Sequence, residues 1–304
     1  MTTLKTPHTT WLDIKDPSPK ELQFLARNYG LHHLIIESLK EPTIRSNAED
    51  YNGYLYVVLH FPVFNPAKKI SEPVEIDFII TPDTLISVRY QKIEPLEDLL
   101  QKCKLPQSAL KDRTMSKGAI YLFYHIVKGL YDFSLRQLDH VDSKIGQIEE
   151  AIFSGHHKEM LLALSLARSD VLNFLRTLRP QNTVLESLLG RSDDGLEKQA
   201  RPYLIDLLGL HHRVLNQAES NRETIEGLQT TNDALLEHRT NEIMKVLTIM
   251  AFITFPLTLL ANIFSMNTQT TPLVGRPYDF WIIVAIMLAA VLTFFVYFKH
   301  KKWL

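Results

Sequence analysis

Residues 245–267 read KVLTIMAFITFPLTLLANIFSMN, and this stretch decides the fold of the chain. No charged side chain occurs between Lys245 and Arg276, and a helix that crosses a bilayer core needs about 20 apolar residues. A second run without charge, Phe280–Phe298, follows after a short connection. Two apolar runs of this length in succession predict a hairpin of membrane helices rather than the buried hairpin of a soluble protein.

The composition of the whole chain conceals this division. Over its 304 residues the chain is 45% hydrophobic and has a formal net charge of -1, as an ordinary soluble protein does. Residues 1–244 carry a net charge of -5, whereas residues 245–304 carry +4. The sequence has no concentrated basic patch, so nucleic acid is not an expected partner. Its one cysteine, Cys103, excludes an internal disulfide and a thiolate metal cluster.

The lysines predict how the hairpin is oriented. Lys245 precedes the first run, and Lys299, Lys301 and Lys302 follow the second, while the connecting segment holds Arg276 as its one basic residue. The positive-inside rule therefore places both ends of the hairpin in the cytoplasm. We expect a multi-pass protein of the cell inner (plasma) membrane, with the lipid bilayer as a partner and with cytoplasmic N- and C-termini.

The first apolar run carries polar residues at helical spacing. Thr254, Thr258 and Asn262 follow one another at intervals of four and so lie along one side of a helix. Polar groups inside a bilayer face other helices or water, which favours a hydrated path. Alternatively, the threonines bond to carbonyl groups of their own helix. One hairpin cannot enclose a pore, so a path requires a ring of subunits.

The sequence before the hairpin predicts two cytoplasmic parts. Residues 1–115 predict an α/β or α+β domain, in which Ser18 caps a short helix with Pro19 in its first turn and Glu21 at its third position. The expected strands are 10–16, 54–61, 74–80 and 85–90, with loops at Pro62, Pro66 and Pro73.

Residues 116–244 predict a helical stalk. Its expected helices are 117–152, 157–178 and 183–189, with breaks at Gly155-His156 and Arg179-Pro180. The last helix then begins with Pro202 in its first turn and runs to Phe264, a length of roughly 95 Å at 1.5 Å per residue. The remaining segments are a first membrane helix (245–265), an external loop (266–279), a second membrane helix (280–299) and a basic tail (300–304).

Several short motifs follow one another along the chain. They are DYNGYLYVVLHFP (50–62), EIDF (75–78), PYLID (202–206), NEIMKVLT (241–248), FPLT (255–258), MN (266–267) and KKWL (301–304). Together they resemble the CorA family of magnesium and divalent-cation transporters, to which the zinc-transporting ZntB branch is related. The resemblance implies a funnel-shaped homopentamer in which the first membrane helix lines the pore and the second surrounds it.

The resemblance also implies roles for individual residues. The pore and selectivity residues would be Asn241, Leu247, Phe255, Thr258, Asn262, Ser265, Met266 and Asn267. Five Asn267 amides would hold a hydrated Mg²⁺ through its waters, since this ion dehydrates reluctantly. Leu247 and Phe255 would be apolar constrictions that block conduction by dewetting. Asp206 matches an aspartate that helps to bind regulatory Mg²⁺ in the family.

These features predict a metal-ion channel rather than an enzyme. The chain has no phosphate loop, nucleophile elbow or HExxH motif, and the membrane potential alone can drive a divalent cation inward. Ser265 stands where the family has glycine, and Leu273 follows Pro272 where a glutamate is common. These departures leave Zn²⁺, Co²⁺ or Ni²⁺ as alternatives to Mg²⁺. They also leave open a membrane-anchored sensor or scaffold that does not conduct.

Overall fold

The computed structural model describes residues 1–51, 53–105, 109–190, 196–266, 273, 275 and 277–301, with only the backbone of 196–199. The chain divides into two compact units, Met1–Gln229 and Thr230–Leu304. The helix α7, Leu196–Ser265, contributes to both units. It begins upstream of Pro202, so the prediction that Pro202 lies in its first turn was wrong.

The first unit contains a six-stranded sheet in the order β1-β2-β6-β5-β4-β3. Its strands are β1 (Thr2–Lys5), β2 (Thr10–Lys15), β3 (Asn47–Tyr51), β4 (Tyr54–Asn65), β5 (Ile70–Ile80) and β6 (Thr84–Arg89). Among the strands of the described residues, only β2 and β6 pair in parallel. The four strands predicted from sequence are confirmed, and the two edge strands β1 and β3 are additional.

The β4–β5 hairpin is longer than predicted because two prolines lie inside it. Pro62 pairs directly with Pro73, so these residues do not mark loops. β3 pairs with β4 only as far as Val58, and β6 pairs with β5 only from Ile76. At the two prolines each strand therefore has one neighbour, and the absent N–H groups are tolerated on the open side.

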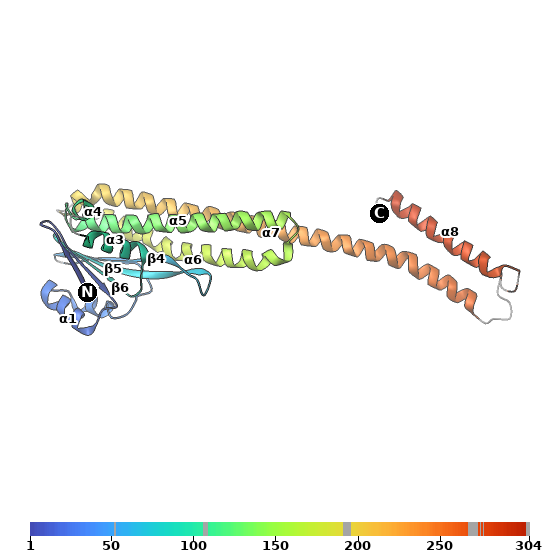
Figure 1. Ribbon diagram of the computed structural model, residues 1–304, viewed down its shortest axis with the longest axis horizontal. Helices are drawn as coiled ribbons and strands as arrows, with labels where there is room; N and C mark the ends of the chain where they lie inside the picture. Colours follow the sequence, from blue (N-terminus) through green and yellow to red (C-terminus); the bar gives the residue numbers. More distant parts are fainter. Residues whose placement is uncertain are drawn as a thin grey trace. The chain divides into compact units, whose positions relative to one another are not determined.

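Helices cover both faces of the sheet (Figure 1). On one face, α1 (Pro19–Tyr29) and α2 (His33–Ser38) bury a leucine- and isoleucine-rich core. The predicted cap of α1 is confirmed, because Ser18 and Glu21 form a reciprocal capping box. The other helices of this unit are α3 (Glu94–Lys104), α4 (Ala109–Thr114), α5 (Ala119–Phe153) and α6 (His157–Gly190). On the second face, Phe123 of α5 packs edge-on against Phe78 at 5.0 Å.

Helix α6 continues through Pro180, where a break was predicted. Packing on both sides of the proline explains the continuity. Gln181 is fully buried, accepts a hydrogen bond from Tyr131 and donates one to the His60 carbonyl. His211 of α7 bonds the Leu178 carbonyl at 2.9 Å. These tertiary contacts outweigh the local preference of proline for a helix end.

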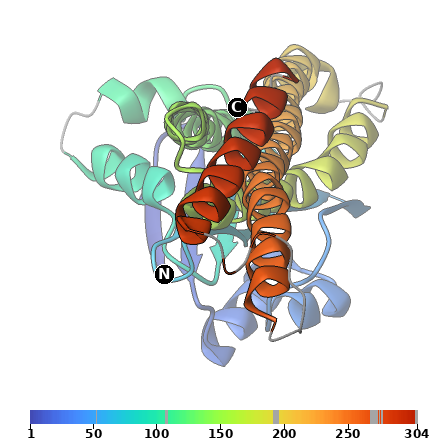
Figure 2. The same ribbon diagram turned by 90° about the vertical axis from the view of Figure 1, so that its right-hand side faces the viewer.

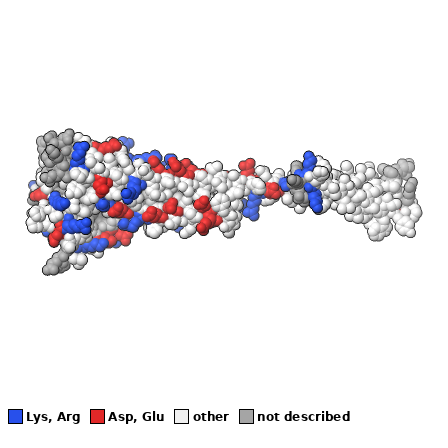
Figure 3. Space-filling view, turned by 90° about the horizontal axis from the view of Figure 1, so that it is seen from above, with Lys and Arg blue, Asp and Glu red and all other residues white. Residues whose placement is uncertain are grey.

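The second unit is a hairpin of the apolar part of α7 and α8 (Asp279–His300) (Figures 1 and 2). Phe252 and Phe298 meet with ring centroids 6.4 Å apart. Figure 3 shows that acidic and basic side chains cover the sheet and helical layers, while the apolar end of the chain is almost free of them. The charged and the uncharged parts of the sequence therefore correspond to different parts of the molecule.

Candidate ion pathway

Two helices are long and apolar enough to cross a membrane, α7 in its C-terminal part and α8. In the most apolar window of α7 only 6% of the residues are buried, and in that of α8 none are. The core helix of a soluble protein would be mostly buried. The apolar side chains of both helices therefore require an apolar surrounding that one chain does not supply.

One face of α7 lies against α8 in the hairpin. Ile249 on this face is buried, with 5% exposure. The half-buried members of the face are Ile253, Pro256, Leu257, Leu260 and Phe264. All of them are apolar, and apart from the adjacent Pro256 and Leu257 they recur every three or four residues, as the 3.6-residue turn of the helix requires. This face holds the hairpin together.

The opposite face of α7 points away from α8 and carries the polar residues. Thr254, Thr258, Asn262 and Ser265 are exposed there, together with Leu247 and Phe255. Asn241 and Met266 are exposed at its edge. The hairpin thus separates an apolar packing face from a stripe that carries polar residues. Asn267 lies outside the described residues, as do Arg276 of the connecting segment and residues 302–304 of the basic tail.

The hydroxyl groups on this helix bond to its own backbone. Thr248 donates to the Met244 carbonyl at 2.7 Å, Thr258 to Thr254 at 2.9 Å, and Ser265 to Asn262 at 3.0 Å. Each hydroxyl oxygen still has lone pairs that face outward. Within the described part of the chain, the side chains of Thr254 and Asn262 form no hydrogen bond. The stripe therefore presents oxygen atoms that can accept hydrogen bonds from water.

Ser265 is the last residue of α7 and has helical backbone geometry. The residues with positive φ near the connection are Leu273, Gly275 and Tyr278. A serine at 265 therefore causes no backbone strain, although glycine would be tolerated there as well.

Asp279, at the start of α8, was not predicted to have a role beyond its charge. Its carboxylate accepts hydrogen bonds from the Gly275 N–H at 3.0 Å and the Phe280 N–H at 2.7 Å. The second bond satisfies a free backbone donor in the first turn of α8, and the first ties the connection to this turn. Asp279 thus fixes the end of the connection to the second helix.

Asp206 lies on the part of α7 that belongs to the first unit, next to α5. Its Oδ2 accepts a hydrogen bond from the Tyr124 hydroxyl at 2.7 Å, and Lys128 Nζ is 3.6 Å away. The hydrogen bond from Lys128 to Tyr124 is the main reason why the pKa of Lys128 is raised, so this amine stays charged. The side chain of Asp206 is 49% exposed. It remains accessible to a cation, but Lys128 already supplies one positive charge.

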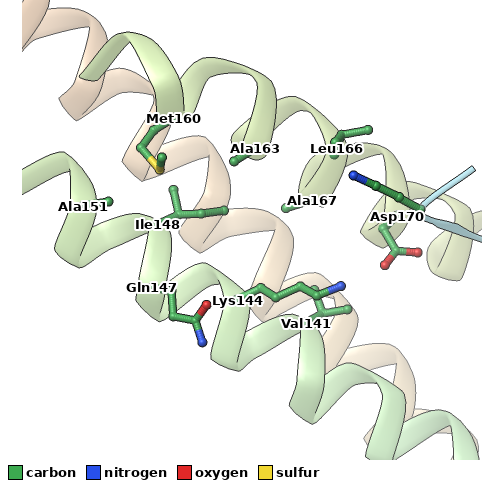
Figure 4. A pocket seen from close by; sticks show the side chains of 11 residues that line it. Val141, Lys144, Gln147, Ile148, Ala151, Met160, Ala163, Leu166, Ala167 and Asp170 are labelled. Atoms are coloured by element: carbon green, nitrogen blue, oxygen red, sulfur yellow. The ribbon is translucent and has the colours of Figure 1, made fainter. Parts of the chain in front are cut away.

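The described residues contain no group of three His, Cys, Asp or Glu side chains that could hold a metal ion. A groove of about 370 Å³ between α5 and α6 is lined mainly by apolar side chains such as Ile148 and Ala163 (Figure 4). Asp170 is the one carboxylate along it, and Asp170 Oδ1 already accepts the Ser71 N–H at 2.6 Å.

A family model described as "CorA-like Mg2+ transporter protein" matches residues 7–300. The chain belongs to this family. The CorA-like proteins are membrane transporters rather than enzymes, so α7 and α8 are membrane helices and the chain is a CorA-like divalent-cation transporter.

The sequences of similar proteins align with nearly the whole chain. The cobalt/magnesium transport protein CorA of Thermotoga maritima is 25% identical over 296 residues, which are 97% of this chain and 83% of that protein. The putative metal ion transporter YfjQ of Bacillus subtilis is 24% identical over 96% of this chain and 89% of its own length. These relatives confirm the resemblance that the motifs predicted.

Solved structures show the same fold. The CorA magnesium transporter from Methanocaldococcus jannaschii has a TM-score of 0.85 at 20% identity, covering 100% of this chain and 94% of that one. The ZntB cytoplasmic domain from Vibrio parahaemolyticus has a TM-score of 0.61 at 15% identity, covering 77% of this chain and 90% of that domain. The predicted α/β domain, long helix and two apolar helices are therefore those of the CorA-like fold.

Proposed function

We propose that this chain forms a funnel-shaped homopentamer that conducts Mg²⁺ through a pore lined by α7 and surrounded by α8. The polar stripe on the face of α7 that points away from α8 carries this proposal. In a ring of hairpins, the α8-facing side of each α7 is already occupied. The stripe is then free to face the axis, where water can solvate Thr254, Thr258 and Asn262.

The residues of the stripe suit a hydrated divalent cation. Mg²⁺ keeps several of its waters, and amide or hydroxyl oxygens of Asn262 and Thr258 can accept hydrogen bonds from them. We propose the same for Asn267, with Ser265 and Met266 beside it at the outer mouth. Leu247 and Phe255 would form apolar rings that stop conduction when they are narrow, and Asn241 would lie at the inner entrance.

The proposed driving force is the membrane potential. A divalent cation that crosses about 100 mV gains roughly 4.6 kcal/mol, at about 2.3 kcal/mol for each charge. The contact of Phe252 with Phe298 supports one orientation, because it brings Lys245 and Lys299 to the same end of the hairpin. In that orientation residues 1–115, 116–244 and 300–304 are cytoplasmic, and 266–279 form the external loop.

Ion flux into liposomes tests the proposal. We expect the purified protein to admit Mg²⁺ at an inside-negative potential, and native mass measurement to give five chains. Competition with Co²⁺, Ni²⁺ and Zn²⁺ in the same assay decides the preferred ion, and a preference for Zn²⁺ would replace Mg²⁺ in the proposal. No flux of any of the four ions, at any internal metal level, would identify a non-conducting sensor or scaffold instead.

We propose further that Asp206 binds regulatory Mg²⁺ at a boundary between subunits. Because Lys128 Nζ lies 3.6 Å from this carboxylate, it competes with the metal. Exposed ion pairs contribute about 0.2–1 kcal/mol, so Lys128→Gln should lower the Mg²⁺ concentration that protects the cytoplasmic domain from trypsin by up to about fivefold.

The control for this variant is Lys144→Gln, which removes an exposed lysine of the same helix, 5.0 Å from the Phe64 ring. It should leave the protective Mg²⁺ concentration unchanged. An equal shift in both variants would show that general surface charge, rather than competition at Asp206, sets the response.

A further inference from the structure

Two acidic residues are buried in the sheet of the first unit. Glu75 and Asp77 are only 4% and 0% exposed, on the central strand β5. Alternate residues of a strand point to the same face, so both lie on one side of the sheet. His60 of β4 pairs directly with Glu75 in the strand register. Buried carboxylates on neighbouring positions are costly unless each oxygen has a hydrogen-bond partner.

The hydrogen bonds of this pair leave one oxygen without a donor. Asp77 Oδ1 accepts the Tyr56 hydroxyl at 2.8 Å, and Asp77 Oδ2 accepts the Tyr90 hydroxyl at 3.2 Å. Glu75 Oε2 accepts the Thr43 hydroxyl at 3.0 Å. Glu75 Oε1 is buried and has no hydrogen-bond partner. An ionised carboxylate can only accept, so a proton on the pair would turn this unpaired acceptor into a donor.

His60 connects the pair to residues 40–46, the strap between α2 and β3. Its Nε2 lies 3.0 Å from both Glu75 Oε2 and the Thr43 carbonyl. Because both neighbours accept, Nε2 must carry a hydrogen. The other ring nitrogen, Nδ1, is 3.1 Å from the Ser46 hydroxyl. Glu75 and His60 thus hold the strap at two points, Thr43 and Ser46.

We propose that Glu75 and Asp77 form a proton-binding site, in which one shared proton keeps the strap closed on the sheet. Removal of this proton leaves two buried anions on adjacent positions of one strand face. Their repulsion then favours opening of the strap, which lets water reach Glu75. The site is independent of the ion path proposed above, and nothing in it requires a metal.

The local electrostatics agree with this arrangement. Burial, and then the neighbouring charge of Glu75, raise the pKa of Asp77 to about 8. Burial lowers the pKa of His60, but its hydrogen bonds to Glu75 and to the Thr43 carbonyl outweigh burial, and the pKa of His60 is raised overall. Both groups therefore hold protons in the closed state at a pH where the open state would release them.

Among the described residues, the other titratable groups that contact the pair are an imidazole and two phenols. Tyr56 and His60 face it from β4, and Tyr90 faces it from the end of β6. Burial raises the pKa of Tyr56 and of Tyr90, so both phenols remain neutral donors. On β3, Glu49 accepts hydrogen bonds from Asn47 and Tyr51. The helices α1 and α2 contribute leucine and isoleucine side chains to this face.

The sign of the pH dependence follows from the raised pKa values. A carboxyl group that titrates near 4 when exposed and near 8 when buried binds an extra proton in the closed state between these values. Closure is therefore strongest at low pH within this window and weakens by up to about tenfold per pH unit as pH rises toward about 8. His60 acts in the same direction above its ordinary pKa.

Hydrogen exchange of the full-length protein in detergent tests the proposal. Protection of the strap amides, corrected for the intrinsic rate at each pH, should fall between about pH 5 and about pH 8 and then level off. Infrared difference spectra should show the carbonyl stretch of a protonated carboxyl disappear as pH rises through about 8. The spectra detect the proton directly, even if strap opening is too rare to measure.

Substitutions test whether Glu75 and Asp77 hold the proton. Glu75→Gln supplies a permanent amide donor in place of the proton, so the strap should stay protected at every pH. Asp77→Asn should remove the infrared signal. The control Glu72→Gln, on the same strand but bound to Lys68 and Asn65 at the surface, should keep both wild-type responses. A wild-type pH dependence in Glu75→Gln, or no protonated carboxyl signal in the wild type, would overturn the proposal.

Discussion

The polar groups of α7 have different partners in its two parts. In the part that belongs to the first unit, His211 and Asn221 are buried and bond carbonyls of neighbouring helices, at Leu178 and Leu138. In the apolar part, the hydroxyls of Thr258 and Ser265 bond only the carbonyls of their own helix. Polar residues of the first kind fix the packing of a subunit. Those of the second kind leave acceptor atoms available to water and ions.

The largest expected effect is on the stripe. Asn262→Leu replaces an amide with an apolar group in every subunit of the proposed ring, which removes acceptors for the waters of Mg²⁺ and favours dewetting. We expect the Mg²⁺ flux into liposomes to fall by about a thousandfold, roughly 4 kcal/mol. The control Ile253→Leu changes the α8-facing side of the same helix and should conduct normally. Normal flux in Asn262→Leu would place the path elsewhere.

The matching change in the first unit should affect stability instead. His211 is fully buried, whereas His212 is exposed. His211→Ala removes a hydrogen bond and leaves a cavity, so we expect a loss of about 2–4 kcal/mol in unfolding free energy. His212→Ala should stay within about 0.5 kcal/mol of the wild type. Chemical denaturation measures both, and flux per folded protein should be unchanged in each.

The same histidine should make the unfolding free energy depend on pH. Burial lowers the pKa of His211, so it stays neutral in the folded chain and takes up a proton only on unfolding. Its contribution to stability is therefore lost as pH falls below the ordinary value of about 6.5. The difference in stability between wild type and His211→Ala should shrink on acidification. A constant difference would show that the pKa of His211 is the same in the folded and the unfolded chain.

A smaller effect on Mg²⁺ flux should distinguish the two membrane helices. Thr258 on α7 and Thr293 on α8 each donate to a carbonyl four residues earlier, at 2.9 and 2.8 Å. Valine has nearly the same shape, so both substitutions remove one hydroxyl from similar local surroundings. We expect Thr258→Val to reduce Mg²⁺ flux by about five- to tenfold, about 1–1.4 kcal/mol, and Thr293→Val to leave it unchanged. Equal losses would mean that the hydroxyls stabilise the helices and do not contact the ion path.

Much of this arrangement could be predicted from the sequence, because the signals are local. The length of the uncharged runs predicts α7 and α8, and Ser18 with Glu21 predicts the cap of α1. The helix through Pro180 could not be predicted, since distant residues such as His211 hold it. The partner of Asp206 is Tyr124, 82 positions away. The buried pair Glu75 and Asp77 reads in sequence as the polar side of a strand, and only the covering helices and strap reveal its burial.

The smallest expected effect concerns Ser265, where the chain departs from the family. Because Ser265 is the final helical residue and its hydroxyl bonds Asn262, Ser265→Gly should loosen the end of α7 by no more than about 1 kcal/mol. It should not change the order of preference among Mg²⁺, Co²⁺, Ni²⁺ and Zn²⁺ in competition flux, because in the proposed pore amide oxygens of the stripe would meet the hydrated ion in both proteins. An altered order would show that backbone freedom at 265 sets the outer mouth. Ser265 would then belong to neither kind of polar residue in α7, since it would act on the ion through its backbone alone.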